Sequence, residues 1–255
     1  DKITCITPDL PDIITKHSRH VILDDVTVLE SRVSGLTFEQ ELIKRCCDIV
    51  VSGIGLLIAS PIMLLEALAI KLEDGGPVFF RQPRVTKDGK VFYVLKFRTM
   101  IVDADKKSKR LASKNDDRIT RVGNILRKTR LDELPQFINI LKGDMSIVGP
   151  RPEQEEITEK YVEVLPEFKY RLKVKAGLTG LAQIQGKYNT TPKDKLILDL
   201  MYIEQYSFWI DLKLMLQTVK VLFKSDSTEG VQGELPIDLP GSASEEKADQ
   251  EADQK

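Results

Sequence analysis

The sequence predicts an α+β protein: a re-entrant membrane helix, then a small domain of helices and short β-hairpins, with amphipathic helices at the membrane interface. Three observations carry this prediction. An apolar run of 22 residues, 49–70, is interrupted by Pro61. An Asp-Gly pair lies between two short apolar segments, which is typical of a β-hairpin. Near the end of the chain, apolar residues recur with the spacing of one helix face.

Residues 1–37 are mixed in character, with Pro8 and Pro11 between short apolar runs. They fit two interpretations equally, the end of a preceding α/β unit or an ordered linker. Because the chain starts at Asp1 without Met, we expect a remnant of an upstream accessory region or linker. His17 and His20 both lie in this segment.

Residues 38–72 form the predicted membrane helix, and Thr37 with Gln40 makes a capping box at its start. If straight, the apolar run would extend about 33 Å, but Pro61 cannot donate to the carbonyl four residues earlier. Each half alone measures only about 18 Å, less than the ~30 Å of a hydrocarbon core. Two geometries follow: a kinked helix that spans, or two helical halves that meet at Ser60 and Pro61 and return to the same side.

The flanking charges favour the re-entrant form. Lys44 and Arg45 precede the run and Lys71 follows it, which gives no clean asymmetry between the two sides of a membrane. Glu66 would be costly at the bilayer centre but tolerable near an interface. A buried core helix is the third interpretation and the weakest, because the apolar faces are uninterrupted.

Residues 73–225 are predicted to form one domain, followed by an acidic, disordered tail over 226–255. Apolar periodicity and turn signals place the elements of the domain. The expected strands are 78–80, 91–95 and 178–185, and the expected helices are 103–111, 124–129, 136–141, 153–164, 194–206 and 210–223. The apolar stripe of the last helix suits a membrane surface and the protein core equally.

Charge and cysteine content limit the partners. The tail holds nine acids and two lysines, which leaves 36 basic and 30 acidic residues upstream, a net charge of +6. A basic body suits a partner that carries phosphate: nucleic acid, a nucleotide or an anionic lipid surface. Cys46 and Cys47 are vicinal and Cys5 is the only other cysteine, which argues for the reduced cytoplasmic side.

We expect the chemistry around Asp132 and Glu133, which precede a short helix beginning at Pro135. A helix start favours anions and keeps a carboxylate ionised. An ordinary N-cap is the competing interpretation, but a cap explains one acid and not the surrounding cations. Those cations are Arg127, Lys128, Arg130 and Arg151, with Lys96, Arg98 and Arg171 as further candidates.

Arg151 lies between Pro150 and Pro152, which fix the local backbone and so aim its side chain. Arginine suits a bidentate grip on phosphate. The sequence has no Cys/His metal-ligand spacing, no P-loop and no nucleophile elbow. Ligands for Mg²⁺ must therefore come from Asp132, Glu133 or scattered acids such as Asp144.

At these residues the chain resembles the bacterial sugar transferases, which are small monotopic phosphoglycosyl transferases. The resemblance covers about residues 38–224. The matching segments are Lys44-Arg45, Ser60-Pro61, 80–82, 96–100, 131–136, 141–146, 149–152, 177–180 and 182–183. The chain departs from the family pattern at Ala176, where many members have proline, and at Lys187, where many have arginine.

The resemblance implies transfer of a sugar 1-phosphate from a UDP-sugar to polyprenyl (undecaprenyl) phosphate with release of UMP. This reaction is the first membrane step of exopolysaccharide, capsule or glycan assembly. Asp132 would form a covalent aspartyl intermediate, which polyprenyl phosphate then resolves. Glu133 with Asp132 would hold Mg²⁺ in the catalytic domain, and the phosphates would be bound by Lys96, Arg98, Arg127, Arg151 and Lys187.

The implied location is the bacterial inner (cytoplasmic) membrane, with the catalytic domain on its cytoplasmic face. A homo-oligomer is compatible with the sequence, and sparse aromatics among the basic residues argue against nucleic acid as a partner. The alternative function is a non-catalytic, membrane-anchored polyanion-binding protein, which would release no UMP from any sugar nucleotide.

Overall fold

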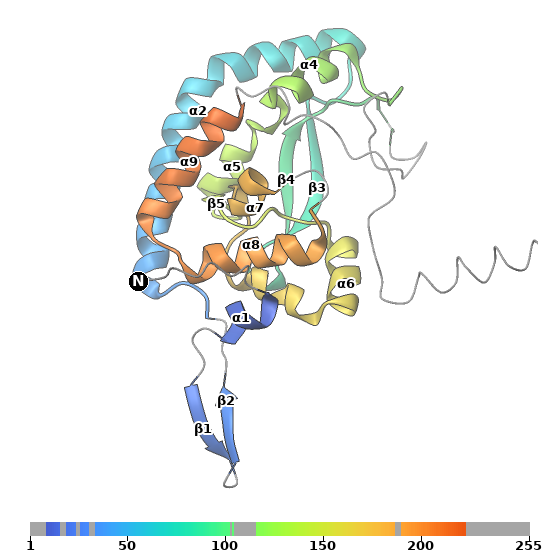
Figure 1. Ribbon diagram of the computed structural model, residues 1–255. Helices are drawn as coiled ribbons and strands as arrows, with labels where there is room; N and C mark the ends of the chain where they lie inside the picture. Colours follow the sequence, from blue (N-terminus) through green and yellow to red (C-terminus); the bar gives the residue numbers. More distant parts are fainter. Residues whose placement is uncertain are drawn as a thin grey trace, which may run out of the picture.

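The computed structural model describes residues 9–15, 19–23, 26–30, 34–102, 104, 116–186 and 190–222. The predictions for most of the 103–111 helix, for Lys187 and for the acidic tail lie outside these residues. Figure 1 shows a mostly helical body, with the β1–β2 hairpin projecting from it beyond α1. The fold is therefore α+β, as the sequence predicts.

The elements follow in chain order. The α-helices are α1 (Leu10–Thr15), α2 (Phe38–Asp74), α4 (Arg121–Thr129), α5 (Gln136–Lys142), α6 (Glu155–Val164), α7 (Leu181–Gln185), α8 (Pro192–Glu204) and α9 (Phe208–Leu222). The 3-10 helices are η1 (Lys87–Gly89), η2 (Leu131–Glu133) and η3 (Pro166–Lys173). The strands are β1 (Arg19–Leu23), β2 (Val26–Glu30), β3 (Phe79–Val85), β4 (Val91–Phe97), β5 (Ser146–Val148) and β6 (Gly177–Thr179).

The strands form three two-stranded sheets: antiparallel β1–β2, antiparallel β3–β4 and parallel β5–β6. The β3–β4 hairpin confirms the Asp-Gly prediction, because Asp88 and Gly89 both adopt positive φ, 57° and 74°. The predicted strand over 178–185 is wrong beyond Thr179. Gly180 ends the strand, and its carbonyl accepts the amides of the next turn, which starts α7.

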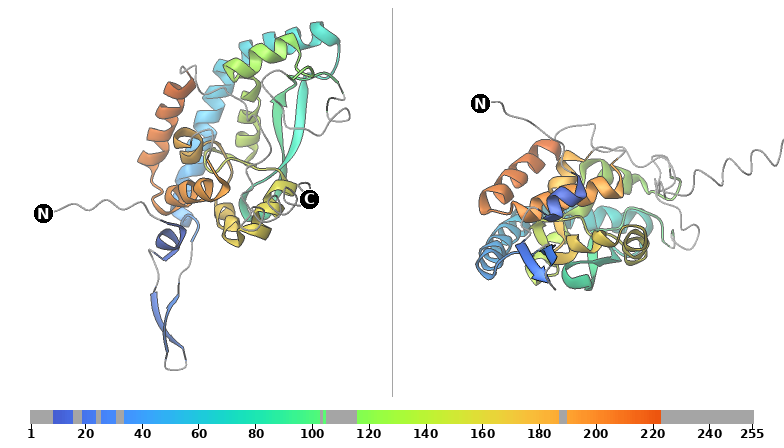
Figure 2. Two further views of the ribbon diagram at one scale, coloured as in Figure 1. Left: turned by 45° about the vertical axis from the view of Figure 1, so that its right-hand side comes forward. Right: turned by 60° about the horizontal axis from the view of Figure 1, so that its bottom comes forward.

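Helix α2 begins with the predicted capping box, in which Thr37 and Gln40 exchange hydrogen bonds of 2.9 and 3.3 Å. The helix is continuous through Pro61, and Figures 1 and 2 show it changing direction along its length. The predicted interruption is thus a bend within one helix. The Ser60 hydroxyl donates to the Leu57 carbonyl at 2.9 Å, so the acceptor that Pro61 cannot serve still has a donor.

In the described part of the chain, α2 is the one helix long and apolar enough to cross a membrane. Only 17% of its most apolar 18-residue window is buried. Such exposure is incompatible with the interpretation as a buried core helix and fits a membrane anchor. Its most exposed large apolar side chains are Phe38, Leu57, Ile58, Leu64, Leu65 and Leu72.

The first end of α2 is fastened to the folded domain by three side chains. Lys44 forms a buried ion pair with Asp211 of α9 at 2.5 Å. Arg45 donates to two carbonyls in the last turn of α5, at 2.6 and 2.7 Å. Asp48 accepts from the Ser146 hydroxyl and from the backbone of β5, both at 2.9 Å.

The second end of α2 is fastened to the same domain. Glu73 accepts the backbone amide of Arg121 at 2.7 Å, which caps the start of α4. Asp74 forms an ion pair with Arg98, immediately after β4. Gly75 then ends the helix with φ of 70°. Both ends of the apolar helix therefore lie on one domain.

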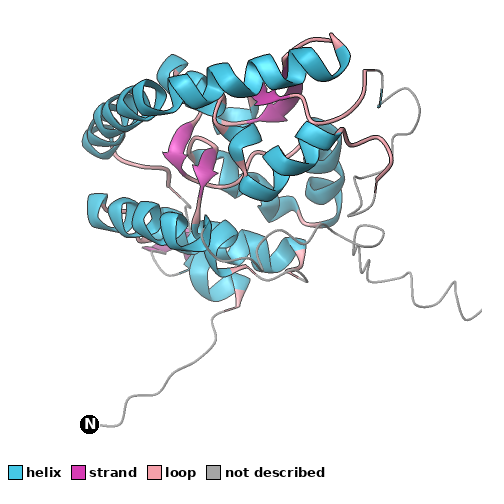
Figure 3. Cartoon of the chain, turned by 90° about the horizontal axis from the view of Figure 1, so that it is seen from above, coloured by secondary structure: helices cyan, strands magenta, loops and turns pink. Residues whose placement is uncertain are grey.

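The main hydrophobic core lies among β4, β5, α5, α8 and η3. Its most buried members are Val94, Ile140, Met145, Val148, Phe168, Leu196 and Leu200. A smaller cluster joins the second half of α2 to β4 and α4 through Ile70, Phe97 and Leu126. Figure 3 shows the short strands enclosed between helices.

Helix α9 combines the two alternatives proposed for its apolar stripe. Leu214 is buried in the main core, and Met215 packs against it. Leu216, Val219 and the preceding Trp209 are exposed. One face of α9 thus belongs to the core, while the other presents apolar side chains suited to a membrane interface.

Candidate active site

Asp132 and Glu133 lie in the tight turn between α4 and α5. Helix α4 ends at Arg130, which adopts the left-handed conformation with φ of 57°. The 3-10 turn η2 follows, with the amide of Glu133 donating to the Arg130 carbonyl at 3.3 Å. Pro135 then leads into α5 with φ of −61°. The acids therefore precede a helix start as predicted, fixed by the turn rather than by a simple cap.

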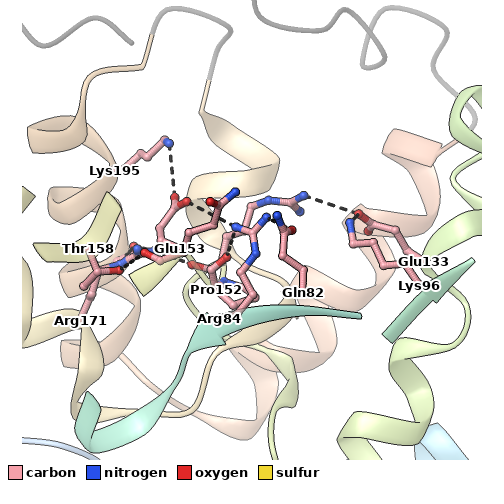
Figure 4. A network of polar contacts seen from close by, with 12 residues as sticks. Gln82, Arg84, Lys96, Glu133, Pro152, Glu153, Thr158, Arg171 and Lys195 are labelled. Atoms are coloured by element: carbon pink, nitrogen blue, oxygen red, sulfur yellow. Dashed lines mark hydrogen bonds and ion pairs between the residues drawn. The ribbon is translucent and has the colours of Figure 1, made fainter. Parts of the chain in front are cut away.

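Glu133 is neutralised by two cations from different elements. Lys96 of β4 contacts its carboxylate at 2.7 Å, and Arg151 contacts it at 3.5 Å. Figure 4 shows Lys96 beside Glu133 at one end of a polar network. Burial alone would raise the pKa of Glu133, but Lys96 and then Arg151 outweigh it and lower the pKa to about 2.

Asp132 has the opposite environment. Burial raises its pKa above the ordinary value, and the neighbouring Glu133 charge adds to that rise. Lys96 and Arg127 oppose the shift without cancelling it. The neighbouring cations, rather than the helix start, therefore keep Glu133 ionised, whereas burial dominates at Asp132.

The predicted phosphate-binding cations divide into two groups. Arg127 interacts with Asp132 and donates from Nε to the Thr99 hydroxyl at 2.9 Å. Lys96 and Arg151 meet at Glu133, as described above. Arg98 is instead buried against Asp74, where it holds the end of α2.

Arg171 also serves a structural purpose. It forms a buried ion pair with Asp199 at 2.8 Å and donates to the Arg151 carbonyl at 3.0 Å. This bond fixes the backbone of Arg151, while the Arg151 side chain stays 45% exposed. The guanidinium is therefore aimed and accessible, as its two flanking prolines predict.

Sequence reasoning also missed the polar network beside Arg151. Arg84 of β3 donates to the Pro152 carbonyl at 3.0 Å and to Gln82 at 2.7 Å. Glu153 lies between Arg84 at 3.9 Å and Lys195 at 3.5 Å. Figure 4 shows this network running from the Glu133 side of the site towards α8. Only its position directly after the Pro-Arg-Pro segment could have marked Glu153.

Glu66, in the second half of α2, is the other residue that sequence reasoning missed. It is 6% exposed and interacts electrostatically with Asp132. The sequence showed only that an acid there is costly in a bilayer. This interaction brings the charge of a membrane-helix side chain to bear on the candidate site.

The family model for the bacterial sugar transferases matches residues 39–225. The chain belongs to the bacterial sugar transferase family. It is 43% identical over 224 residues to the UDP-glucose:undecaprenyl-phosphate glucose-1-phosphate transferase of Escherichia coli (strain K12), covering 85% of this chain and 48% of that protein. The chain thus spans about half the length of this relative.

Two further relatives extend the comparison. The Caulobacter vibrioides protein with the same printed name is 43% identical over 192 residues, 73% of this chain and 72% of that protein. The Aeromonas hydrophila UDP-N-acetylgalactosamine-undecaprenyl-phosphate N-acetylgalactosaminephosphotransferase is 41% identical over 183 residues, 71% of this chain and 43% of that protein.

In this bacterial sugar transferase, the residues present fit a divalent cation. Within the described ranges no three metal-ligating side chains converge closely enough to hold an ion by themselves. Mg²⁺ is commonly bound by one or two carboxylates, with waters and substrate phosphates completing its shell. Asp132 and Glu133 supply two such carboxylates, and the buried Glu66 oxygens have no hydrogen-bond donor among the residues that the structure describes.

Proposed function

We propose that this chain carries the catalytic part of a transferase that moves a sugar 1-phosphate from a UDP-sugar to polyprenyl (undecaprenyl) phosphate and releases UMP. The relatives' names support this donor and acceptor. The observation that carries the proposal is the placement of Asp132 among fixed cations, against the membrane helix. A lipid phosphate and a water-soluble nucleotide can both reach such a site.

Asp132 is the nucleophile. Its carboxylate oxygen forms a bond to the β-phosphorus, and the bond from that phosphorus to the bridging oxygen breaks, so UMP leaves with the oxygen. A phosphate oxygen of the acceptor then attacks the same phosphorus and releases Asp132. Covalent catalysis by a carboxylate divides one difficult displacement into two easier ones.

The surrounding cations offset charge during both displacements. Arg127 is fixed by Thr99 next to Asp132, and Arg151 is held at its backbone by Arg171. Preorganised cations of this kind stabilise a transferring phosphoryl group without further rearrangement. Bound Mg²⁺ would neutralise the diphosphate, with Asp132 and Glu133 as its protein ligands. We expect Lys187 to bind phosphate as well.

The membrane arrangement is part of the proposal. Both ends of α2 bind the same domain, which supports a re-entrant helix with both ends on the cytoplasmic face of the inner membrane. The exposed apolar residues of α2 would then lie in the near half of the bilayer. The acceptor phosphate would meet Asp132 at that boundary.

The decisive experiment incubates the protein with a UDP-sugar and Mg²⁺ but no acceptor, and measures its intact mass. Wild type should gain the mass of one sugar phosphate. Asp132→Asn should gain none, because a neutral amide is a very poor nucleophile. Glu133→Gln should react slowly and need more Mg²⁺.

A panel of UDP-sugars, scored for UMP release, identifies the donor; hexoses such as glucose or galactose are the expected sugars. A full-size adduct on Asp132→Asn would exclude Asp132 as the nucleophile. Turnover only when donor and acceptor are bound together would indicate direct transfer instead. No UMP from any donor would favour the polyanion-binding alternative.

A further inference from the structure

Glu66 is a buried carboxylate without a hydrogen-bond donor. It lies on the face of α2 that also bears Met63, Ala67 and Ile70, which pack against the catalytic domain. Neither of its carboxylate oxygens has a hydrogen-bond partner among the described residues. A buried acceptor without a donor is destabilising, and more so if it is charged. A buried carboxylate at this position is therefore expected to bind a group that comes from outside the protein chain.

The charge around Glu66 points the same way. Among the described residues, Asp132 is the one whose charge acts on Glu66 beside the effect of burial, and the interaction is repulsive. Glu133 differs, because Lys96 and Arg151 already neutralise it. The negative charges of Glu66 and Asp132 therefore repel each other between the membrane helix and Asp132, and no cation neutralises Glu66 there among the described residues.

The chemistry of the arriving groups identifies that partner. The phosphates of donor and acceptor are anions that only accept hydrogen bonds, so they would add to the repulsion. A hydrated divalent cation supplies positive charge, and its water ligands are hydrogen-bond donors. Mg²⁺ in particular keeps several waters when it binds to protein. Because no three carboxylates converge directly in the described ranges, contact through water fits better than direct coordination.

We propose that Glu66 is a positioning residue for the divalent cation: it accepts hydrogen bonds from the cation's water ligands and holds the hydrated ion against Asp132 from the side of the membrane helix. The inference rests on the proposed function and adds a third carboxylate to its site. It also makes the packing of α2 a requirement for a complete cation site.

The test measures binding of Mn²⁺, as a paramagnetic substitute for Mg²⁺, by electron paramagnetic resonance without any sugar nucleotide. Glu66→Gln keeps the size and removes the charge, so the Mn²⁺ Kd should rise about tenfold or more, as for other residues that hold metal-bound ligands. Glu66→Asp keeps the charge on a shorter side chain and should show an intermediate Kd. Glu41→Gln is the matched control on the same helix, because Glu41 pairs with Lys87 instead.

Thermal unfolding shows which variants are folded. An unchanged Kd in folded Glu66→Gln overturns the proposal. If that variant does not fold, a Glu66→Asp Kd equal to wild type overturns it. Failure of the proposed function would give a different result. If the wild-type protein binds Mn²⁺ through Glu66 but releases no UMP, the cation site is supported and the proposed reaction is contradicted.

Discussion

Adjacent carboxylates at positions 132 and 133 have opposite electrostatic surroundings. Glu133 is held ionised by Lys96 and Arg151, whereas burial and the Glu133 charge resist ionisation of Asp132. The Glu133 carboxylate is a fixed negative charge, whereas the pKa of Asp132 is raised, so the two acids suit different roles. The environments, rather than the residue types, support Asp132 as nucleophile and Glu133 as ligand.

Removal of Lys96 should make the site more sensitive to acid. Lys96 lowers the pKa of both carboxyl groups, so Lys96→Met should raise both. The ionised forms are then lost at a higher pH as the solution is acidified. The acid limb of the rate of adduct formation should shift upwards relative to wild type. Superimposable pH profiles would show that Lys96 does not control these carboxylates.

Arg151 should be sensitive even to a change that keeps its charge. Arg151→Lys loses the planar pair of donors, and one charged hydrogen bond is worth about 1.5–3 kcal/mol. The rate of UMP release should therefore fall roughly ten- to hundredfold. Sedimentation with membranes should be unchanged. Lys128→Gln, which removes an exposed cation beside Arg127, should keep nearly the wild-type rate; an equal loss in both variants would point to general charge alone.

At this scale the sequence predicted much of the site. It identified Asp132, Glu133, Lys96, Arg127 and Arg151, and the structure brings them together. It also placed Arg98 among the phosphate-binding cations, because the competing partner Asp74 reaches Arg98 only once the end of α2 packs beside β4. Which face of α2 turns towards Asp132 likewise depends on tertiary packing, so Glu66 went unassigned.

Among the elements, α2 has the strongest link to the domain at its first end. The ammonium of Lys44 is buried with the Asp211 carboxylate, which also accepts the Tyr202 hydroxyl at 2.8 Å. The link joins the start of the membrane helix to α9. Burial raises the pKa of Asp211, so its charge depends on these partners.

Breaking this link on one side should be costly. Lys44→Met leaves Asp211 buried without its cation, and we expect a loss of about 3–5 kcal/mol in the free energy of unfolding. The double variant Lys44→Met/Asp211→Leu removes both charges and should recover much of that loss. Urea unfolding in detergent micelles measures both. Additive losses in the double variant would contradict a coupled pair.

Element prediction succeeded where the signal was local. The capping box and the Asp-Gly hairpin both depend on neighbouring residues, and both are confirmed. The 178–185 segment failed because its pairing is not local. Strand β6 pairs in parallel with β5, which is only three residues long, and the chain turns into α7 beyond that edge.

For the whole molecule, the two fastened ends of α2 make a clear topological prediction. Phe38 and Leu72 lie near opposite ends of the helix, and both are highly exposed. In a background without the native cysteines, Phe38→Cys and Leu72→Cys should be labelled from the same face of sealed vesicles. Labelling from opposite faces would establish a spanning helix.

Alanine at both Ser60 and Pro61 provides the comparison for this measurement. The substitutions restore the amide donor for the Leu57 carbonyl and remove the steric cause of the bend. They should therefore favour a straight helix, and part of the Leu72→Cys population should move to the opposite face. The composition of the chain predicted an apolar helix. Only the contacts at its two ends show that both ends bind the same domain.

The fastening of α2 also has a consequence for the order of events during synthesis. Lys44 and Asp211 are 167 residues apart in sequence. At about 5–20 residues per second, a ribosome needs on the order of 10–30 s to reach Asp211 after it has made Lys44. Throughout that interval the apolar helix exists without the Lys44–Asp211 contact at its first end. A re-entrant α2 would therefore depend first on features of the nascent helix itself, Pro61 and its charged flanks, and the late Lys44–Asp211 contact would then stabilise that orientation.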